Sequence, residues 1–458
     1  MAKTKELLLI YPRVRYPSGD VPLGILYLAS ALRKHLNIKP EIIDLGFFKN
    51  PFQEIKRLVK ETRYQWVGIS AMITMADATK KIAQIIKSLS PQTQIIVGGP
   101  HPTTIPERCL DQNFDYLVLG EAEQTISEII GGKNLEGISG IWFKKNGEWI
   151  KNPARKPIEN LDELAFPAFD LIPLERYKRL WFQLDTIGKP IQGTNIIASR
   201  GCPYQCSYCQ PTLEKLFGRK LRKRSPENIV SELVWLKEQF QIEGFIFVDD
   251  TLIVDKLWCQ ELAKAMVKAR LNLVFGANVR AELVEEDILS ELKSAGLRKI
   301  YLGVESFSER IRNQVLNKKI TNQEIIRALG IAKKLGLKVQ GYFMIGSPGE
   351  TKAEVKSTLA FARRLNFDDL TINFTTPLPG TFLYQKYGSE LLVREEELDY
   401  YRVYAFRSKN FTPLWLRTMQ FLGYVLFYLK WKRLLALFQM FFSRAFFQRT
   451  ILKLKRVL

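Results

Sequence analysis

The sequence predicts an α/β protein made of two successive sets of strands and helices, followed by a helical C-terminal region. Short, continuously apolar segments alternate with segments of helical period, and this alternation occurs twice, before residue 150 and after residue 190. With 46% hydrophobic and 25% charged residues, the composition is that of an ordinary globular chain. We therefore predict domains at 1–150 and 191–385, joined by a proline-rich connector at 151–190, and a helical region at 386–458.

The first domain has five apolar segments that we interpret as buried strands of a parallel sheet, at 6–12, 40–45, 65–72, 94–100 and 115–121. The intervening segments have the helical period and are expected to cover both faces of the sheet: 24–35, 51–62, 76–90 and 123–132. Ligands of such sheets bind at the loops that leave the carboxyl ends of the strands.

Small residues mark these loops. Ser70 ends the third predicted strand, and Gly98 and Gly99 end the fourth, directly before Pro100 and His101. Paired glycines turn the chain, and they also let the backbone approach a bulky ligand because no Cβ intervenes.

The arrangement resembles the cobalamin-binding Rossmann domain, which has a serine motif after its third strand and a glycine pair after its fourth. The resemblance implies that cobalamin contacts Ser70, Gly98, Gly99, His101 and Glu121, the last lying after the fifth strand. Many such domains carry an Asp-x-His-x-x-Gly motif whose histidine binds cobalt from below.

Here the corresponding loop reads GDVPLG, with Pro22 where that ligand would be expected. The sequence has only two histidines, His35 and His101. We therefore expect cobalt with no histidine below it.

The second domain begins with a cluster of cysteines. Cys202, Cys206 and Cys209 follow its first predicted strand, in a chain that has only five cysteines. This usage disfavours a secreted disulfide framework, and a zinc site would need a fourth ligand from a second pair. A cubane iron–sulfur cluster fits better, because three thiolates leave one iron open to a substrate atom. Cys109 and Cys259 are interpreted as buried small residues.

The spacing CxxxCxxC, with Tyr208 before the third cysteine, resembles the radical S-adenosylmethionine superfamily. Members hold a [4Fe–4S] cluster whose open iron binds the methionyl group of S-adenosylmethionine. An external donor reduces the cluster, and the cofactor is then cleaved to a 5′-deoxyadenosyl radical. Six predicted strands, at 194–200, 244–250, 273–280, 299–306, 338–346 and 370–377, fit the partial (β/α)6 barrel of that family.

The ends of these strands carry the remaining candidates. By resemblance, the residues that bind S-adenosylmethionine are Tyr208, Asp249, Asp250, Asn278, Arg280, Glu305, Ser306 and Gly346. Acidic residues at strand ends also cap helices, so no single motif is decisive. The resemblance depends on motifs in register at all six strand ends, the last of which is PLPGT at 377–381.

The C-terminal region is basic and apolar. No Asp or Glu follows Asp399, and the 12 Lys and Arg residues after it account for more than half of the net charge of +21. The longest charge-free stretch, 418–429, is shorter than the roughly 20 residues that span a bilayer. We expect the C-terminal region to lie on an anionic membrane surface. The alternative is that it forms a helical cap on the barrel and that its cations are solvated. No nucleic-acid-binding module is recognised.

The sequence thus resembles cobalamin-dependent radical S-adenosylmethionine enzymes over residues 1–385. The resemblance implies a C-methyltransferase in which one S-adenosylmethionine methylates cobalt and a second generates the radical. A radical cyclase of the same family and a non-catalytic cobalamin- or cluster-binding sensor are the alternatives. We expect a hydrophobic small-molecule substrate and peripheral attachment to the membrane. We also expect a cytoplasmic protein, because the apolar run near the N-terminus is too short for a signal peptide.

Overall fold

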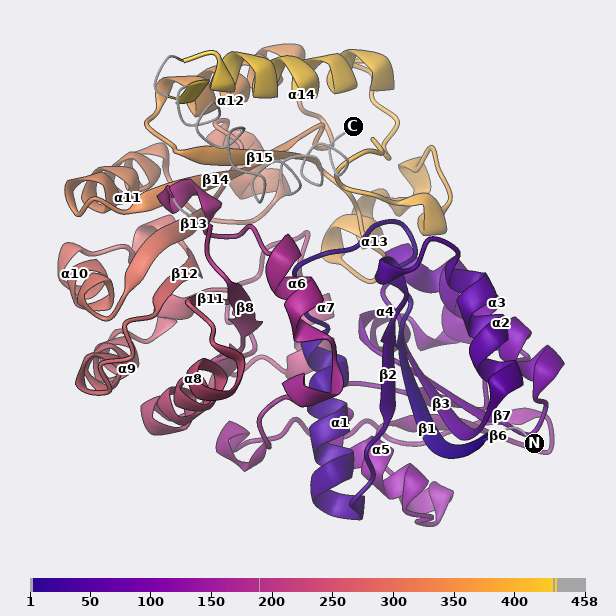
Figure 1. Cartoon of the computed structure of the whole chain (residues 1–458). Coiled ribbons are helices and arrows are strands. Elements are labelled where there is room, and N and C mark those ends of the chain that lie inside the picture. Colours follow the sequence, from indigo (N-terminus) through magenta and orange to yellow (C-terminus); the bar gives the residue numbers. More distant parts are fainter. Residues whose placement is uncertain (1–2, 189, 431–432, 435–458) are drawn as a thin grey trace. The chain divides into compact units, whose positions relative to one another are not determined.

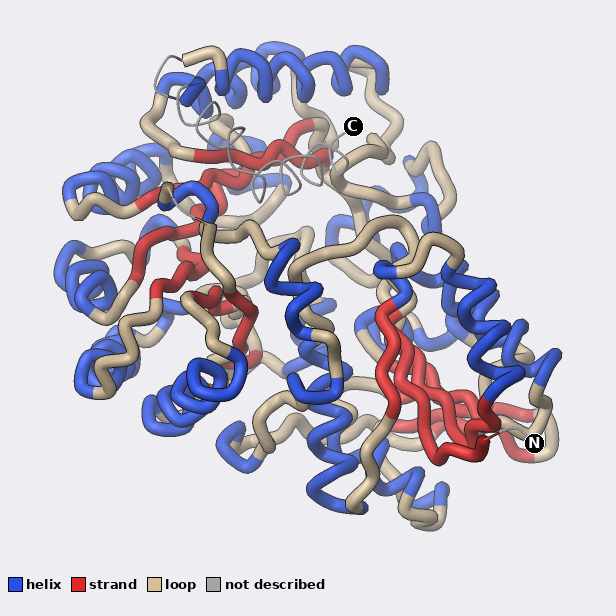
Figure 2. The backbone as a smooth tube through the Cα atoms, in the orientation of Figure 1, coloured by secondary structure: helices blue, strands red, loops and turns tan. Residues whose placement is uncertain are grey.

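The computed structural model describes residues 3–188, 190–430 and 433–434 (Figure 1). The chain divides into two compact units, Met1–Tyr177 with Thr212–Arg222, and Lys178–Pro211 with Lys223–Leu458. Both contain strands that alternate with helices (Figure 2). The short segment 212–222 follows the cysteines in sequence and folds with the first unit.

A sheet of order β2-β1-β3-β4-β5-β6-β7 forms the centre of the first unit. Its five predicted strands are confirmed and pair in parallel: β1 (Lys3–Tyr11), β2 (Glu41–Asp44), β3 (Thr62–Ser70), β4 (Gln94–Gly98) and β5 (Tyr116–Val118). Two strands that we did not predict extend it in antiparallel, β6 (Ile141–Lys145) and β7 (Glu148–Lys151). Asn146 and Gly147 join them and both have positive φ, as the two-residue hairpin turn requires.

The apolar character of β1 follows from burial on both faces of the sheet. Leu7 and Leu9 pack in a core with α1 (Leu23–Leu36) and α5 (Glu123–Ile130). Leu8 and Ile10 pack in another with α2 (Pro51–Glu61) and α3 (Ala76–Leu89). Successive side chains of a strand point to opposite faces, so a doubly covered strand contains no polar alternation.

The second unit contains a parallel sheet with strands in chain order. Its strands confirm the six predicted ones: β8 (Gly193–Ile196), β11 (Gly244–Phe247), β12 (Val274–Val279), β13 (Leu297–Glu305), β14 (Lys338–Ile345) and β15 (Asp369–Phe374). Helices α8 (Pro226–Phe240), α9 (Lys256–Lys268), α10 (Glu286–Ser294), α11 (Asn322–Lys334) and α12 (Lys352–Arg364) connect them along one side (Figure 1). β8 and β15 are the edges, so the barrel is partial.

The second unit also contains the longer helix α14 (Pro413–Tyr428). The shorter elements are α4 (Pro100–Thr104), α6 (Leu174–Leu180), α7 (Thr212–Phe217), α13 (Phe382–Tyr387) and the two-residue strands β9 (Ser199–Arg200) and β10 (Arg222–Lys223).

Part of the predicted connector is a structural component of the barrel. Trp181 packs in a buried cluster with Ile246 and Tyr301, and its indole N–H donates to Asn195 Oδ1 at 2.9 Å. The main-chain oxygen of Gln183 accepts from Lys299 Nζ and from the Tyr301 hydroxyl. Trp181, Leu184 and Ile191 of this segment therefore pack against strands of the open sheet.

Helix α14 packs along the edge strand β15. Gln420 Nε2 donates to the Ile372 carbonyl at 2.8 Å, and the Ile372 N–H donates to the Tyr424 hydroxyl at 2.9 Å. Leu416 and Phe427 are buried on the same side of the helix. This side of α14 therefore packs on the barrel, as expected from the alternative interpretation that the C-terminal region is a helical cap. Among the described residues, no helix is long and apolar enough to cross a membrane.

The packing of Gly193 against the Trp181 ring predicts how an added methyl group changes the stability of the protein. We expect Gly193→Ala to lower the free energy of unfolding by roughly 1–3 kcal/mol, because its Cβ would overlap the Trp181 ring. Gly330→Ala, in helix α11 where a Cβ meets nothing within 4 Å, should instead stabilise the protein by about 0.5–1 kcal/mol. Denaturant unfolding of both variants tests this, and an equal effect of the two would contradict it.

Candidate active site

The three predicted cluster cysteines lie in one loop that follows β9. The Cys209 and Gln210 N–H groups both donate to the Cys206 carbonyl, at 3.0 and 2.9 Å, which closes a tight turn. The buried side chain of Gln210 donates to the Tyr204 carbonyl at 3.1 Å and so braces the turn from within. The loop therefore has a defined conformation made by its own hydrogen bonds.

Three thiols in one loop can serve as ligands of separate irons of a cubane cluster. Among the residues that the structure describes, no three His, Cys, Asp or Glu side chains are grouped around a site for one metal ion. Burial raises the pKa of the Cys202 thiol to about 11, so iron binding must supply the free energy that deprotonates it.

Arg280, at the end of β12, connects the cysteine loop to the rest of the barrel rim. Its guanidinium donates to Cys206 Sγ at 3.4 Å and to the Lys318 carbonyl at 2.6 Å. The same group lies 3.7 Å from the centre of the Tyr204 ring. These contacts fix the cysteine loop against the end of β12.

Asp249, after β11, is buried and accepts hydrogen bonds from the Ala198 N–H and the Ser199 hydroxyl. Burial raises its pKa to about 6. Asn278 donates to the Asp249 carbonyl at 2.9 Å, so the ends of β11 and β12 are held together. The neighbouring Asp250 is exposed and available to a ligand.

A buried polar group that includes an unpredicted residue stands beside the third cysteine. Lys318 Nζ donates to Glu305 Oε1 at 2.6 Å, and the Tyr208 hydroxyl donates to the same oxygen at 3.1 Å. Burial, followed by the charge of Glu305, raises the pKa of Tyr208. Glu305 adopts a positive φ of 62° at a register shift between β13 and β14, which turns its side chain out of the regular sheet.

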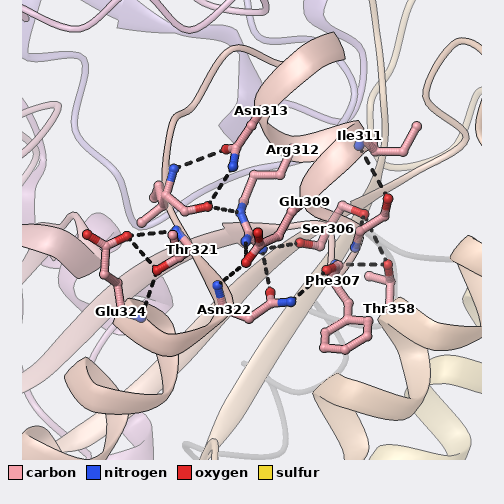
Figure 3. Close-up of polar contacts among 12 residues, drawn as sticks. Ser306, Phe307, Glu309, Ile311, Arg312, Asn313, Thr321, Asn322, Glu324 and Thr358 are labelled. Carbon is pink, nitrogen blue, oxygen red and sulfur yellow. Dashed lines mark hydrogen bonds and ion pairs between the residues drawn. The ribbon is translucent and has the colours of Figure 1, made fainter.

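The loop that carries Lys318 is held by the fully buried Arg312 (Figure 3). The Arg312 guanidinium donates to the carbonyls of Ser306 and Ile320 and to Asn322 Oδ1, at 2.6, 2.8 and 2.9 Å. The Lys318 N–H donates to the Arg312 carbonyl. These bonds fold 306–322 back on itself and place Lys318 beside Glu305. The Ser306 hydroxyl contacts Thr358 of α12 at 3.2 Å.

The turn after β14 surrounds a buried carboxylate. Gly346 has φ of 82°, and the N–H groups of Gly346 and Ser347 both donate to Glu350 Oε2, at 2.7 and 2.9 Å. A side chain at Gly346 would overlap Tyr404 and Leu416, so this glycine is required by packing. Burial raises the pKa of Glu350 to about 8.

In the first unit, the loops after β3 and β4 form a joint cradle. The Ala71 N–H donates to the Gly98 carbonyl at 2.7 Å, and the His101 N–H donates to the Ala71 carbonyl at 3.0 Å. Gly99 has φ of 106°, and a Cβ there would lie 2.9 Å from the Ala71 oxygen. A Cβ at Gly98 would make only ordinary contacts with the chain, so packing does not require this glycine. Close approach of a bulky ligand would require it.

The carboxylate of Glu121, which we expected to contact cobalamin, is bonded to other residues of the protein. Arg222, from the segment after the cysteines, forms a paired contact with its carboxylate at 2.9 and 3.0 Å, and the Ile158 N–H donates to it at 2.6 Å. Both charged side chains are buried. Lys215 of the same segment donates to the Thr104 carbonyl in α4, directly after the cradle. Glu121 therefore fixes the segment 212–222 to the first unit.

Comparison with known proteins agrees with this geometry. The Radical SAM superfamily profile matches residues 196–362, and the B12 binding domain profile matches residues 18–130. An uncharacterised methyltransferase of Pyrococcus horikoshii is 32% identical over 448 residues, which cover 94% of each chain. The chain belongs to the cobalamin-binding radical S-adenosylmethionine enzymes.

A named relative and a solved structure resemble this radical S-adenosylmethionine enzyme. An anaerobic magnesium-protoporphyrin IX monomethyl ester cyclase of Rubrivivax gelatinosus is 25% identical and covers 89% of this chain and 73% of its own. The radical S-adenosylmethionine methyltransferase TsrM of Kitasatospora setae, solved with cobalamin and a [4Fe–4S] cluster, has a TM-score of 0.71 at 18% identity. The match covers 85% of this chain and 78% of that chain, and shows a shared fold.

The family confirms the predicted fold class and the three predicted cofactors: a [4Fe–4S] cluster, S-adenosylmethionine and cobalamin. Among the predicted site residues, the structure brings Tyr208 and Glu305 into contact, and likewise Arg280 with Cys206 and Asn278 with Asp249. It also joins the loops of Ser70, Gly98, Gly99 and His101. Lys318, Arg312, Glu350 and Arg222 were not predicted.

The ion pair of Glu121 predicts a structural effect of Arg222. We expect Arg222→Met to lower the free energy of unfolding by about 3–5 kcal/mol, because it leaves a buried carboxylate unpaired. Glu121→Gln, which keeps an acceptor for Ile158, should cost less. Thermal unfolding of the cofactor-free enzyme measures both. If Glu121→Gln instead weakened cobalamin binding without changing stability, Glu121 would be a cobalamin contact.

The pKa of Glu350 predicts a pH dependence. Its folded-state pKa of about 8 lies above the ordinary 4.5, so the folded enzyme binds an extra proton between these values. Stability should therefore fall as pH rises from about 4.5 to 8, and Glu350→Gln should flatten this fall. Glu354→Gln is the matched control and should leave the slope in this range unchanged. Burial raises the pKa of Glu354, but hydrogen bonds from Arg310 and Ser308 lower it to about 2, so its contribution to stability changes only below about pH 4.5. Melting temperatures across this range would contradict the assignment if Glu350→Gln followed the wild-type curve.

Proposed function

We propose that this enzyme is a C-methyltransferase acting on an unactivated carbon of a hydrophobic substrate such as a lipid, isoprenoid or tetrapyrrole. The observation that carries the reaction class is full-length similarity to a methyltransferase, together with both cofactor domains in one chain. When bound, the cluster supplies the electron that cleaves S-adenosylmethionine, and cobalamin carries the methyl group. The enzyme also needs an external electron donor.

Several side chains of the site can be given a role in binding the cluster and S-adenosylmethionine. Cys202, Cys206 and Cys209 hold the cluster, and Arg280 keeps Cys206 in place. Exposed Asp250 is suited to the methionyl amine, since a carboxylate attracts an ammonium group. The Lys318 ammonium group has three N–H donors, of which one bonds Glu305 and one lies near the Tyr208 hydroxyl, so that a further donor is suited to the methionyl carboxylate.

Ring formation is a second candidate, favoured by the similarity to the magnesium-protoporphyrin cyclase. The same cofactors would serve both reactions. Product mass separates them, because methylation adds one CH2 unit to the substrate and cyclisation does not. Lipid and pigment extracts from cells with and without the protein would identify the substrate class.

We expect cluster binding and turnover to require three particular cysteines. Cys202→Ala, Cys206→Ala and Cys209→Ala should each abolish the iron–sulfur absorbance and the formation of 5′-deoxyadenosine, while cobalamin binding persists. Cys109→Ala and Cys259→Ala are matched controls, since both side chains are buried and Cys259 Sγ contacts the Leu252 carbonyl. Loss of the cluster in either control would show that the ligands are misassigned, and reconstituted wild-type enzyme that produced no 5′-deoxyadenosine would contradict the proposed reaction.

We also propose a cytoplasmic location at the inner face of the membrane. The five cysteines are free thiols, as is usual in a reducing compartment. The positively charged C-terminal region suits attachment to anionic lipid, although its residues 435–458 lie outside the described part of the chain.

A further inference from the structure

Helix α14 has one side that no described element covers. Its buried side faces the barrel edge through Leu416, Gln420, Gly423 and Phe427. The other side exposes large apolar side chains, of which Leu414, Phe421 and Leu429 are 75%, 56% and 57% exposed. Leu422, Val425 and Leu426 are also exposed. The five side chains follow Leu414 by 7, 8, 11, 12 and 15 residues, and this spacing places all six on one side of a helix. We call these six residues the α14 stripe.

Exposed cations accompany this stripe. Helices α12 and α14 run side by side in the same direction, since Lys352 Nζ lies over the Trp415 ring and Lys430 Nζ donates to the Arg364 carbonyl. Their exposed basic residues are Lys352, Lys356, Arg363, Arg364, Arg417 and Lys430. The acid of α12, Glu354, is already paired with Arg310.

We propose that the α14 stripe inserts into the headgroup region of an anionic membrane, with the exposed cations of α12 and α14 contacting lipid phosphates. An apolar stripe in water, bordered by cations, is the arrangement of an interfacial helix. Each cation near an anionic surface adds attraction, and the apolar side chains add attraction that salt does not screen. The membrane-facing side is opposite to the side that caps β15, so one helix performs both roles.

The charge of this surface argues against a second copy of the chain as its occupant, because that copy would bring an identical set of cations against the first. An anionic surface complements the exposed cations of α12 and α14.

Vesicle sedimentation of the full-length enzyme, without S-adenosylmethionine, tests the inference. Vesicles of phosphatidylcholine with phosphatidylglycerol should bind at least about tenfold more protein than phosphatidylcholine alone at low salt. The triple variant Phe421→Gln, Leu426→Gln, Leu429→Gln should lose about tenfold or more of this binding, because three apolar side chains no longer insert. Lys356→Gln, Arg363→Gln and Arg364→Gln together should weaken binding mainly at low salt.

Matched controls lie on other helices of the same unit. Leu257→Gln in α9 and Ile326→Gln in α11 also replace exposed apolar side chains and should leave vesicle binding unchanged. Equal binding of the triple variant and wild type, or equal binding to both vesicle types, would overturn the proposal. So would a wild-type dimer that the triple variant converts to monomer, because the stripe would then be a contact between copies. Vesicle binding needs no turnover, so its outcome is independent of the methyltransferase proposal.

Discussion

Parallel pairing is the constraint on which the second unit depends. Strands that run in the same direction must all end at one edge of the sheet, and each must return through a helix. The six strands from β8 to β15 therefore bring residues that are far apart in sequence, such as Cys206, Arg280 and Lys318, within hydrogen-bonding distance. Regular backbone stops at this edge, so side chains must satisfy the polar groups of the loops.

The buried charges at this edge form a connected set. Glu305 balances Lys318, the Lys318 carbonyl accepts from Arg280, and Arg312 holds the loop between them. Removing one member would leave its partner buried without compensation, which costs far more than an exposed pair would. The same connections keep the cysteine loop in one conformation, and a defined loop can hold three irons while leaving the fourth open.

Features coded by neighbouring residues could be predicted from the sequence. The strands, the three cysteines and the motif after each strand depend on local pattern; the structure confirms the strands, and the family profiles confirm the two cofactor domains. Lys318 could not be singled out, because its role comes from a partner 13 residues away and from a fold held by Arg312. The pairing of Arg222 with Glu121 spans 101 residues, and Trp181 has its partners in other strands. The hairpin of β6 and β7 did have a local signal, Asn146-Gly147, which we overlooked.

The packing of α14 on β15 protects the edge of the sheet against pairing with other chains. An edge strand normally offers its free N–H and C=O groups to any other extended chain. Here Gln420 and Tyr424 occupy both groups of Ile372 with side chains rather than with another strand. A side chain cannot pass the pairing on to a further strand, so the sheet is terminated chemically as well as sterically. Detachment of this helix would turn the barrel edge into a template for aggregation.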